Sequence, residues 1–96
     1  MNAIDRHYIE KTIFRNLNAG QLPKKWSEIP DYIQRGLLTQ EELRRHFGTY
    51  CRKSLDYLRH FTDCSLTYWK AEIASIETVF QQLEEGETVR YKGVEF

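Results

Sequence analysis

Two consecutive stretches of the chain repeat apolar residues at the spacing of an α-helix, and this pattern limits the possible folds more than any other feature. Steps of three and four residues place side chains on one helical face. In the first stretch that face comprises Leu43, Phe47, Cys51, Leu55, Leu58 and Phe61. In the second it comprises Leu66, Trp69, Ile73, Ile76, Phe80 and Leu83. Cap-forming residues between Thr62 and Ser65 separate the two, so we predict an antiparallel helical hairpin over about 40–61 and 65–85.

A capping box marks the start of the first helix of this hairpin. Glu42 follows Thr39 by three residues, so the hydroxyl and the carboxylate can each satisfy a backbone N–H that the helix leaves unpaired. Leu38 and Leu43 flank the cap and can pack together as a hydrophobic staple. Gly48 lies further along this helix, where glycine costs about 1 kcal/mol relative to alanine. We therefore expect either a closely packed neighbour or a bend at Gly48.

An N-terminal helix is the third helical element that the sequence predicts. Ile9, Ile13 and Leu17 recur at steps of four residues, which indicates a helix over about 3–18. Asn2 is a candidate N-cap for this helix, because its side chain can accept from a backbone N–H of the first turn.

A connector that contains both prolines of the chain follows the N-terminal helix. Pro30 suits the first position of a short helix that runs to about Arg35. Trp26 is expected to pin the connector to the body of the protein, because so large an apolar side chain needs a packing site. An exposed bond before Pro23 or Pro30 could populate cis and bind a prolyl isomerase, whereas prolines of this kind also rigidify turns.

The last ten residues have the residue pattern of a strand, whereas the residues before them have that of a helix. Val89, Tyr91, Val94 and Phe96 indicate an extended tail with a turn near Gly93. A single strand cannot satisfy its own backbone, so the tail must pair either with a partner protein or with another part of the chain.

Together these elements predict an all-α fold in which a small helical bundle forms one domain. The predicted parts are an N-terminal helix in residues 1–20, a connector with a short helix in 21–38, the helical hairpin in 39–86 and an extended tail in 87–96.

An aromatic content of 14% and a net charge of zero exclude a disordered chain. No apolar run approaches the roughly 20 residues of a membrane span, and the first residues lack a signal-peptide pattern, so we expect a cytoplasmic protein.

Four potential zinc ligands lie in or beside the first helix of the hairpin: His46, Cys51, His60 and Cys64. The interval from His46 to Cys51 does not match a paired-ligand motif, and Cys51 belongs to the apolar face. We therefore expect ordinary helix residues and no metal or other cofactor. No nucleophile motif and no phosphate-binding loop is present in the sequence, which favours a protein without enzymatic activity.

The charges of the chain are unevenly distributed. Arg45, Arg52 and Arg59 recur at seven-residue steps on the polar side of the first hairpin helix, whereas residues 72–95 are predominantly acidic. The arginines could follow phosphates, meet an acidic protein surface, or simply form the solvated face of an amphipathic helix. A surface with both signs of charge favours a protein partner over bare DNA.

The whole chain resembles a known family of phage proteins. The likeness extends from MNAIDRHYIEKTIF through LPKKWSEIPDYI and GLLTQEEL to VRYKGVEF, and it is to the small anti-RecBCD proteins of lambdoid Salmonella phages. The resemblance implies a non-enzymatic inhibitor or modulator that binds the host RecBCD helicase-nuclease through its RecC subunit in the host cytoplasm. It further implies an altered response of RecBCD to Chi, in support of phage recombination and protection of DNA ends. A host peptidyl-prolyl isomerase would fit as an additional partner.

Aromatic side chains beyond those that a small helical core needs suggest docking on a larger protein, since Trp, Tyr and Arg dominate binding energies at interfaces. The candidate contact residues are Pro23, Trp26, Pro30, Tyr50, Arg52, Tyr57, Arg59, Tyr91 and Phe96. Two other functions stay open: a small helical nucleic-acid-binding protein that uses the arginines, and an inhibitor of another host defence enzyme. Binding to bare DNA that weakens steeply with salt would distinguish the first of these.

Overall fold

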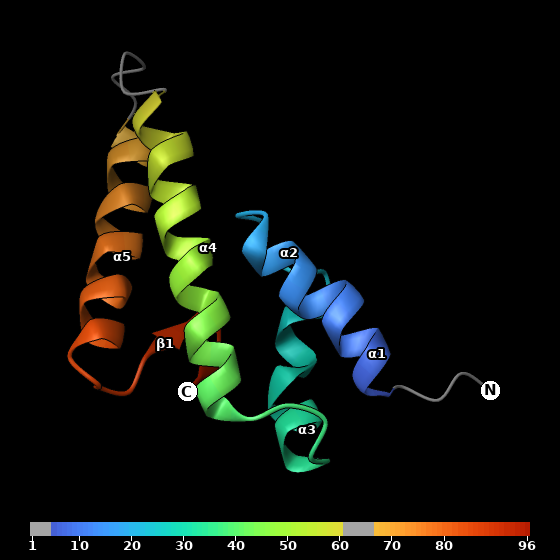
Figure 1. Cartoon of the computed structure of the whole chain (residues 1–96). Helices are drawn as coiled ribbons and strands as arrows, with labels where there is room; N and C mark the ends of the chain where they lie inside the picture. The colour runs from blue at the N-terminus through green and yellow to red at the C-terminus, as the bar shows by residue number, and fades with distance from the viewer. Residues whose placement is uncertain (1–4, 61–66) are drawn as a thin grey trace.

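The computed structural model describes the backbone of residues 5–60 and 67–96 and the side chains of residues 5–60 and 70–96. Helices α4 (Gln40–His60) and α5 (Thr67–Glu84) lie side by side and run in opposite directions (Figure 1). Buried side chains of α4 include Leu43, Phe47 and Cys51, and α5 buries Ile76 against them. The prediction of a mostly helical bundle built on an antiparallel helical hairpin is confirmed.

The capping box at the start of α4 forms as predicted. The backbone N–H of Glu42 donates to the Thr39 hydroxyl at 3.1 Å, and the backbone N–H of Thr39 donates to the Glu42 carboxylate at 3.2 Å. Leu38 and Leu43 on either side of the cap are both buried, as the hydrophobic staple requires. This local signal therefore fixes where α4 begins.

At Gly48 the structure has a closely packed neighbour, which is one of the two predicted alternatives. A Cβ atom at Gly48 would lie 3.3 Å from Cδ2 of Leu83 in α5. The missing side chain thus allows α5 to approach α4 at this point.

We expect Gly48→Val to lower the free energy of unfolding by about 1–3 kcal/mol, because its two methyl groups overpack the contact with Leu83. Urea unfolding followed by circular dichroism measures the change. Gly48→Ala is the matched control, since its gain of about 1 kcal/mol in helix propensity offsets a tight but single contact. A valine variant as stable as the alanine variant would show that the helices separate freely here.

The N-terminal helix contains an irregular turn at its centre. Segments α1 (Arg6–Ile9) and α2 (Arg15–Asn18) are joined by a π-helical turn, Glu10–Phe14. The wider π turn allows the adjacent residues Ile13 and Phe14 both to be buried. Asp5 caps the helix, accepting from the backbone N–H of Tyr8 at 2.9 Å. The predicted cap, Asn2, lies outside the described residues.

The connector folds into a short 3₁₀ turn, Trp26–Glu28, followed by α3 (Ile29–Gln34). Pro30 lies in the first turn of α3, where its missing N–H has no partner to lose. The short helix is therefore confirmed, beginning one residue earlier than predicted.

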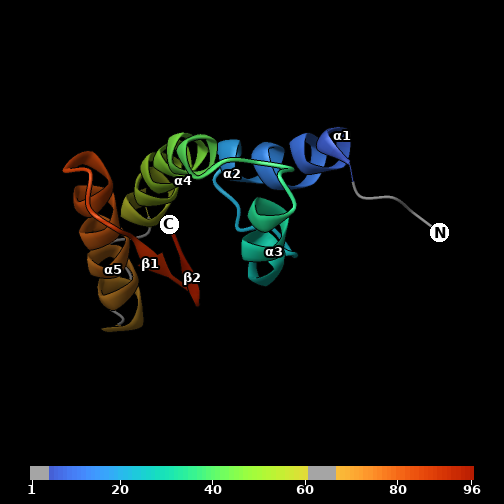
Figure 2. The ribbon, with the colours of Figure 1, turned by 90° about the horizontal axis from the view of Figure 1, so that it is seen from below.

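The C-terminal segment is extended and turns at Gly93, as predicted, and its two strands pair with each other. Strands β1 (Arg90–Tyr91) and β2 (Val94–Glu95) form an antiparallel hairpin. Its two turn residues, Lys92 and Gly93, both have positive φ, as a tight hairpin turn with the strands' right-handed twist requires. Figure 2 shows that this β-hairpin lies between α5 and α3. Of the two pairings considered from the sequence, the structure has the internal one.

Five aromatic side chains from three distant parts of the chain meet in the core: Trp26, Phe47, Tyr50, Tyr91 and Phe96. We call this group the aromatic cluster. The indole N–H of Trp26 donates to the Tyr91 carbonyl at 2.9 Å, and the Tyr50 and Tyr91 hydroxyls lie 3.0 Å apart. Burial and the bond to Tyr50 raise the pKa of the Tyr91 hydroxyl above its usual value. The cluster joins the connector and the β-hairpin to α4.

The aromatic cluster corrects four of the predicted contact residues. The exposed fractions are 4% for Trp26, 6% for Tyr50, 5% for Tyr91 and 4% for Phe96. The expectation that the fold leaves these side chains exposed is wrong, because the β-hairpin brings its own aromatic residues back over the connector and α4. Trp26 does pin the connector to the body, as its size predicted.

Candidate protein-docking surface

The remaining predicted contact residues do not gather on one surface. Pro23 is buried, so it is a further correction, and Pro30 is exposed on α3. Arg52, Tyr57 and Arg59 are exposed on α4. Arg52 and Arg59 line a groove between α4 and α5, whereas Tyr57 lines a groove beside the end of α2. Tyr57 thus faces a different side of the molecule from the two arginines.

Tyr57 stands out among the apolar side chains that the structure describes. Its exposed fraction is 63%, and it is the one large hydrophobic residue in the described part of the chain that is exposed. The residues that line the groove with it are Ala19, Gly20, Gln21 and Lys53. An aromatic ring exposed beside polar and cationic groups is the arrangement that interface anchors have.

A second groove continues from this one along the junction of the N-terminal helix and α4. The two grooves share Ala19 and Lys53 and have volumes of about 570 and 710 Å³. We call the pair the α2/α4 seam. Gly20 permits the close approach of the two elements, since a Cβ atom there would lie 2.9 Å from Cβ of Lys53. The Ser54 hydroxyl donates to the Gly20 carbonyl at 3.3 Å and fixes this contact.

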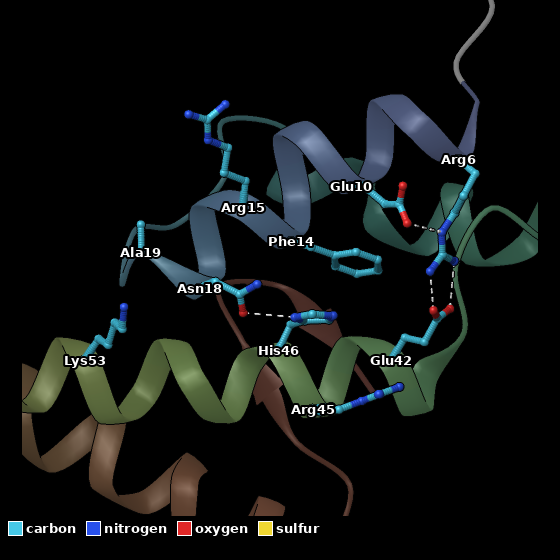
Figure 3. A pocket seen from close by; sticks show the side chains of 10 residues that line it. All are labelled: Arg6, Glu10, Phe14, Arg15, Asn18, Ala19, Glu42, Arg45, His46 and Lys53. Atoms are coloured by element: carbon cyan, nitrogen blue, oxygen red, sulfur yellow. Dashed lines mark hydrogen bonds and ion pairs between the residues drawn. The ribbon is translucent and has the colours of Figure 1, made fainter.

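One end of the seam is closed by a network of charges (Figure 3). The Arg6 guanidinium donates to both carboxylate oxygens of Glu42 and lies 3.6 Å from Glu10. The Arg6 bond, assisted by the backbone N–H of Thr39, lowers the pKa of the Glu42 carboxyl to about 2. These carboxylates neutralise Arg6 and leave that end of the seam without excess positive charge.

Stacked rings form the middle of the seam. The His46 imidazole lies parallel to the Phe14 ring at a centroid distance of 4.1 Å, and the Arg6 guanidinium lies 5.1 Å from the same ring. Nδ1 of His46 donates to the Asn18 side-chain carbonyl at 2.9 Å. Burial, and secondarily the charge of Arg45, lower the pKa of His46 below its usual value. The imidazole is therefore neutral at pH 7 and serves as a packing group.

The other cations that line the seam are not neutralised by carboxylates as Arg6 is. Arg15, Arg45 and Lys53 are exposed, and within residues 5–60 and 67–96 none of them has an ion pair or side-chain hydrogen bond. Figure 3 shows Arg15 and Lys53 at the end of the groove opposite Arg6, on either side of Ala19. Arg15 and Lys53 thus make basic the end of the seam at which Tyr57 lies, whereas Arg45 lies between His46 and Glu42 (Figure 3).

Arg45, Arg52 and Arg59 form what we call the arginine ladder of α4, and the last two of them meet acidic residues of α5. The Arg59 guanidinium donates to Glu77 at 3.2 Å, and Arg52 and Glu84 line the same groove of about 390 Å³. An exposed pair of this kind contributes only about 0–1 kcal/mol, but it offsets the positive potential of the ladder. The bipolar distribution seen in the sequence therefore places opposite charges side by side.

The proposed zinc ligands do not converge in the described part of the chain. His46 is stacked on Phe14, and Cys51 is fully buried among apolar side chains. Burial raises the pKa of the Cys51 thiol to about 12, so the thiol stays protonated at neutral pH. Across residues 5–60 and 67–96 no three His, Cys, Asp or Glu side chains form a metal-binding group. Cys64 lies outside the described residues.

Of the two alternatives for the prolines, the structure favours the one in which they rigidify the connector. Pro23 is buried, and Pro30 is held within α3. All peptide bonds in the described segments are trans. Neither X-Pro bond is therefore presented in a free loop of the folded chain.

No family model, curated protein or solved structure matches the chain. Among the described helices, none combines the length and the apolar character needed to cross a lipid bilayer.

Sequence reasoning missed most of the seam. The sequence carries no functional prediction for Phe14, Arg15 or Lys53. Their positions in the sequence hold no shared motif, because they come from different helices. The sequence does single out four residues of the seam: Tyr57 as a candidate contact, Arg45 among the spaced arginines, His46 as a potential zinc ligand and Glu42 in the capping box.

We expect Glu42→Gln to destabilise the protein by about 1 kcal/mol at pH 7, because it weakens both the cap at Thr39 and the Arg6 pair, which is partly exposed. The pKa of Glu42 in the folded protein, about 2, lies below its usual 4.5. The stability it contributes is thus present above about pH 4.5 and is lost as pH falls toward 2. Urea unfolding at pH 7, 4.5 and 2.5 should show the difference between variant and wild type shrinking with acidification. Glu10→Gln is the control, and a difference independent of pH would contradict the assignment.

Proposed function

We propose that the chain is a phage-encoded, non-enzymatic modulator of the host RecBCD helicase-nuclease. It binds RecBCD through the RecC subunit in the host cytoplasm, alters the response to Chi, and so supports phage recombination and protects DNA ends. The resemblance of the sequence over its full length to small anti-RecBCD proteins supports the identity of the target.

The observation that carries the proposal of protein binding is the exposure of Tyr57 at the basic end of the α2/α4 seam. A tyrosine exposed by 63% loses contact with water when a partner covers it, and it gains an aromatic contact with little loss of conformational freedom. The other four aromatic residues predicted to contact a partner are buried in the core. The proposed binding surface is therefore centred on Tyr57.

Nucleic-acid binding is less well supported than protein binding. Arg59 is paired with Glu77, and Arg52 shares its groove with Glu77 and Glu84, so phosphates approaching the ladder would meet carboxylates. The net charge of zero adds no long-range attraction to DNA. A prolyl isomerase as an additional partner stays a proposal that would require a local opening around Pro23.

Capture of purified RecBCD on the immobilised full-length chain at physiological salt tests the proposal. We expect retention of all three RecBCD subunits, and retention of RecC alone when the subunits are presented singly. Chi-dependent cleavage of linear DNA should change in the presence of the chain. Absence of RecBCD from the captured fraction would refute this function, and co-purification from infected cells would then identify whether another defence enzyme is bound.

A further inference from the structure

We infer that the α2/α4 seam binds an acidic segment of a partner polypeptide, laid along the groove with Tyr57 at one end. The identity of the biological partner rests on the function proposed above, whereas the chemistry of the segment follows from the seam itself. Arg15, Arg45 and Lys53 would pair with its carboxylates.

The charge of the seam favours an acidic ligand. Three cations line it without an ion pair in the described residues, whereas Arg6 in the same groove is bound by two carboxylates. Cations that face a groove between two helices repel one another at close range, and an anionic ligand removes that repulsion. The carboxylates of a polypeptide supply such charge at spacings that separate cations can match.

The length of the seam suits a short extended segment. Arg45 and Tyr57 both lie on α4 and are separated by 57 − 45 = 12 residues. At about 1.5 Å per residue this separation is about 18 Å along the helix axis. A fully extended chain advances about 3.3 Å per residue, so five or six residues would cover the distance. Ala19, the small residue shared by both grooves, leaves the path between Arg15 and Lys53 open.

Polypeptide is favoured over single-stranded nucleic acid by two features of the seam. The carboxylates of Glu10 and Glu42 line the end near Arg6 and would repel a continuous run of phosphates. Tyr57 is the one large exposed hydrophobic residue of the described chain, so successive bases would lack further rings on which to stack. An acidic segment needs only one apolar contact and a few carboxylates.

Nuclear magnetic resonance titration of the ¹⁵N-labelled full-length chain tests the inference, with hexaglutamate as the probe. We expect saturable shifts of the backbone amides of Arg15, Ala19, Lys53 and Tyr57. The triple variant Arg15→Glu, Arg45→Glu and Lys53→Glu should bind the peptide at least 10-fold more weakly. A control with the same change in net charge reverses exposed cations elsewhere, at Lys24, Lys70 and Arg90, and should bind within 2-fold of wild type.

Several outcomes would overturn the inference. Shifts that do not saturate or that lie away from the seam would do so, and so would equal weakening by the control variant. A hexanucleotide of thymidine that binds the seam more tightly than hexaglutamate would assign the groove to nucleic acid instead. Well-dispersed spectra of both triple variants establish that they are folded.

The same variants separate this inference from the proposed function. If wild type captures RecBCD and the seam variant captures it equally well, the seam inference fails and the function stands. If wild type binds hexaglutamate at the seam but does not capture RecBCD, the function fails and the acidic specificity of the seam stands.

Discussion

Replacing Trp26 by alanine is expected to lower the free energy of unfolding by about 3–5 kcal/mol, which is a large part of the stability of a domain of this size. The side chain stacks on Phe47 at 5.7 Å and meets the rings of Tyr91 and Phe96 edge-on at 6.0 Å. Its removal leaves a cavity where the connector, α4 and the β-hairpin meet, and it leaves the Tyr91 carbonyl without the indole N–H. Urea unfolding followed by fluorescence and circular dichroism measures the loss.

Trp26→Phe separates packing from hydrogen bonding in this experiment. Phenylalanine keeps a ring in the aromatic cluster but cannot donate to the Tyr91 carbonyl, so its cost should be smaller than that of alanine. A Trp26→Ala protein that stays as stable as wild type, yet loses its partner, would mean that the indole acts at an interface and that its burial in the core is not the source of its importance.

The helices follow from local patterns, and the sequence predicts them well. A capping box depends on residues three positions apart, so Thr39 and Glu42 determine the start of α4 without reference to the rest of the chain. The apolar periodicity likewise specifies which side of α4 is buried. At Gly48 the pattern narrows the possibilities to close packing or a bend, and only the position of Leu83 decides between them.

The aromatic residues could not be assigned in this way, because their burial depends on contacts between distant segments. Tyr50 and Tyr57 are one heptad apart and lie on nearly the same face of α4, yet the first is buried and the second is exposed. Tyr91 of the β-hairpin covers Tyr50, with the two hydroxyl groups 3.0 Å apart, and Tyr57 lies one heptad further along α4. The sequence contains the hairpin turn at Gly93 but not the place where the hairpin docks.

The α2/α4 seam also depends on contacts between distant segments, so it could not be predicted from the sequence. Lys53 and Arg15 come from different helices, and their proximity depends on how closely α2 approaches α4 at Gly20. Helical periodicity defines a face but not the partner or the angle at which it packs. The spacing of charges along the sequence reveals the arginine ladder of α4, whose charge α5 partly neutralises. It does not reveal which cations lack an ion pair in the described part of the folded chain.

Tyr57→Ala should weaken the binding of RecBCD by about 30-fold, which corresponds to about 2 kcal/mol for an aromatic anchor at an interface. The substitution should change the free energy of unfolding by about 1 kcal/mol or less, since the side chain is exposed by 63%. Biolayer interferometry with purified RecBCD measures the first quantity and urea unfolding the second.

Two matched variants make the result of Tyr57→Ala specific. Tyr57→Phe keeps the ring and should retain most of the affinity if packing of the ring provides the energy, whereas Lys70→Ala changes an exposed residue of α5 and should leave affinity within about 2-fold. Binding of RecBCD that is unchanged by Tyr57→Ala would remove Tyr57 from the interface. The contrast with Trp26→Ala then becomes the decisive comparison, because a core residue alters stability first and an interface residue alters affinity while the protein remains folded.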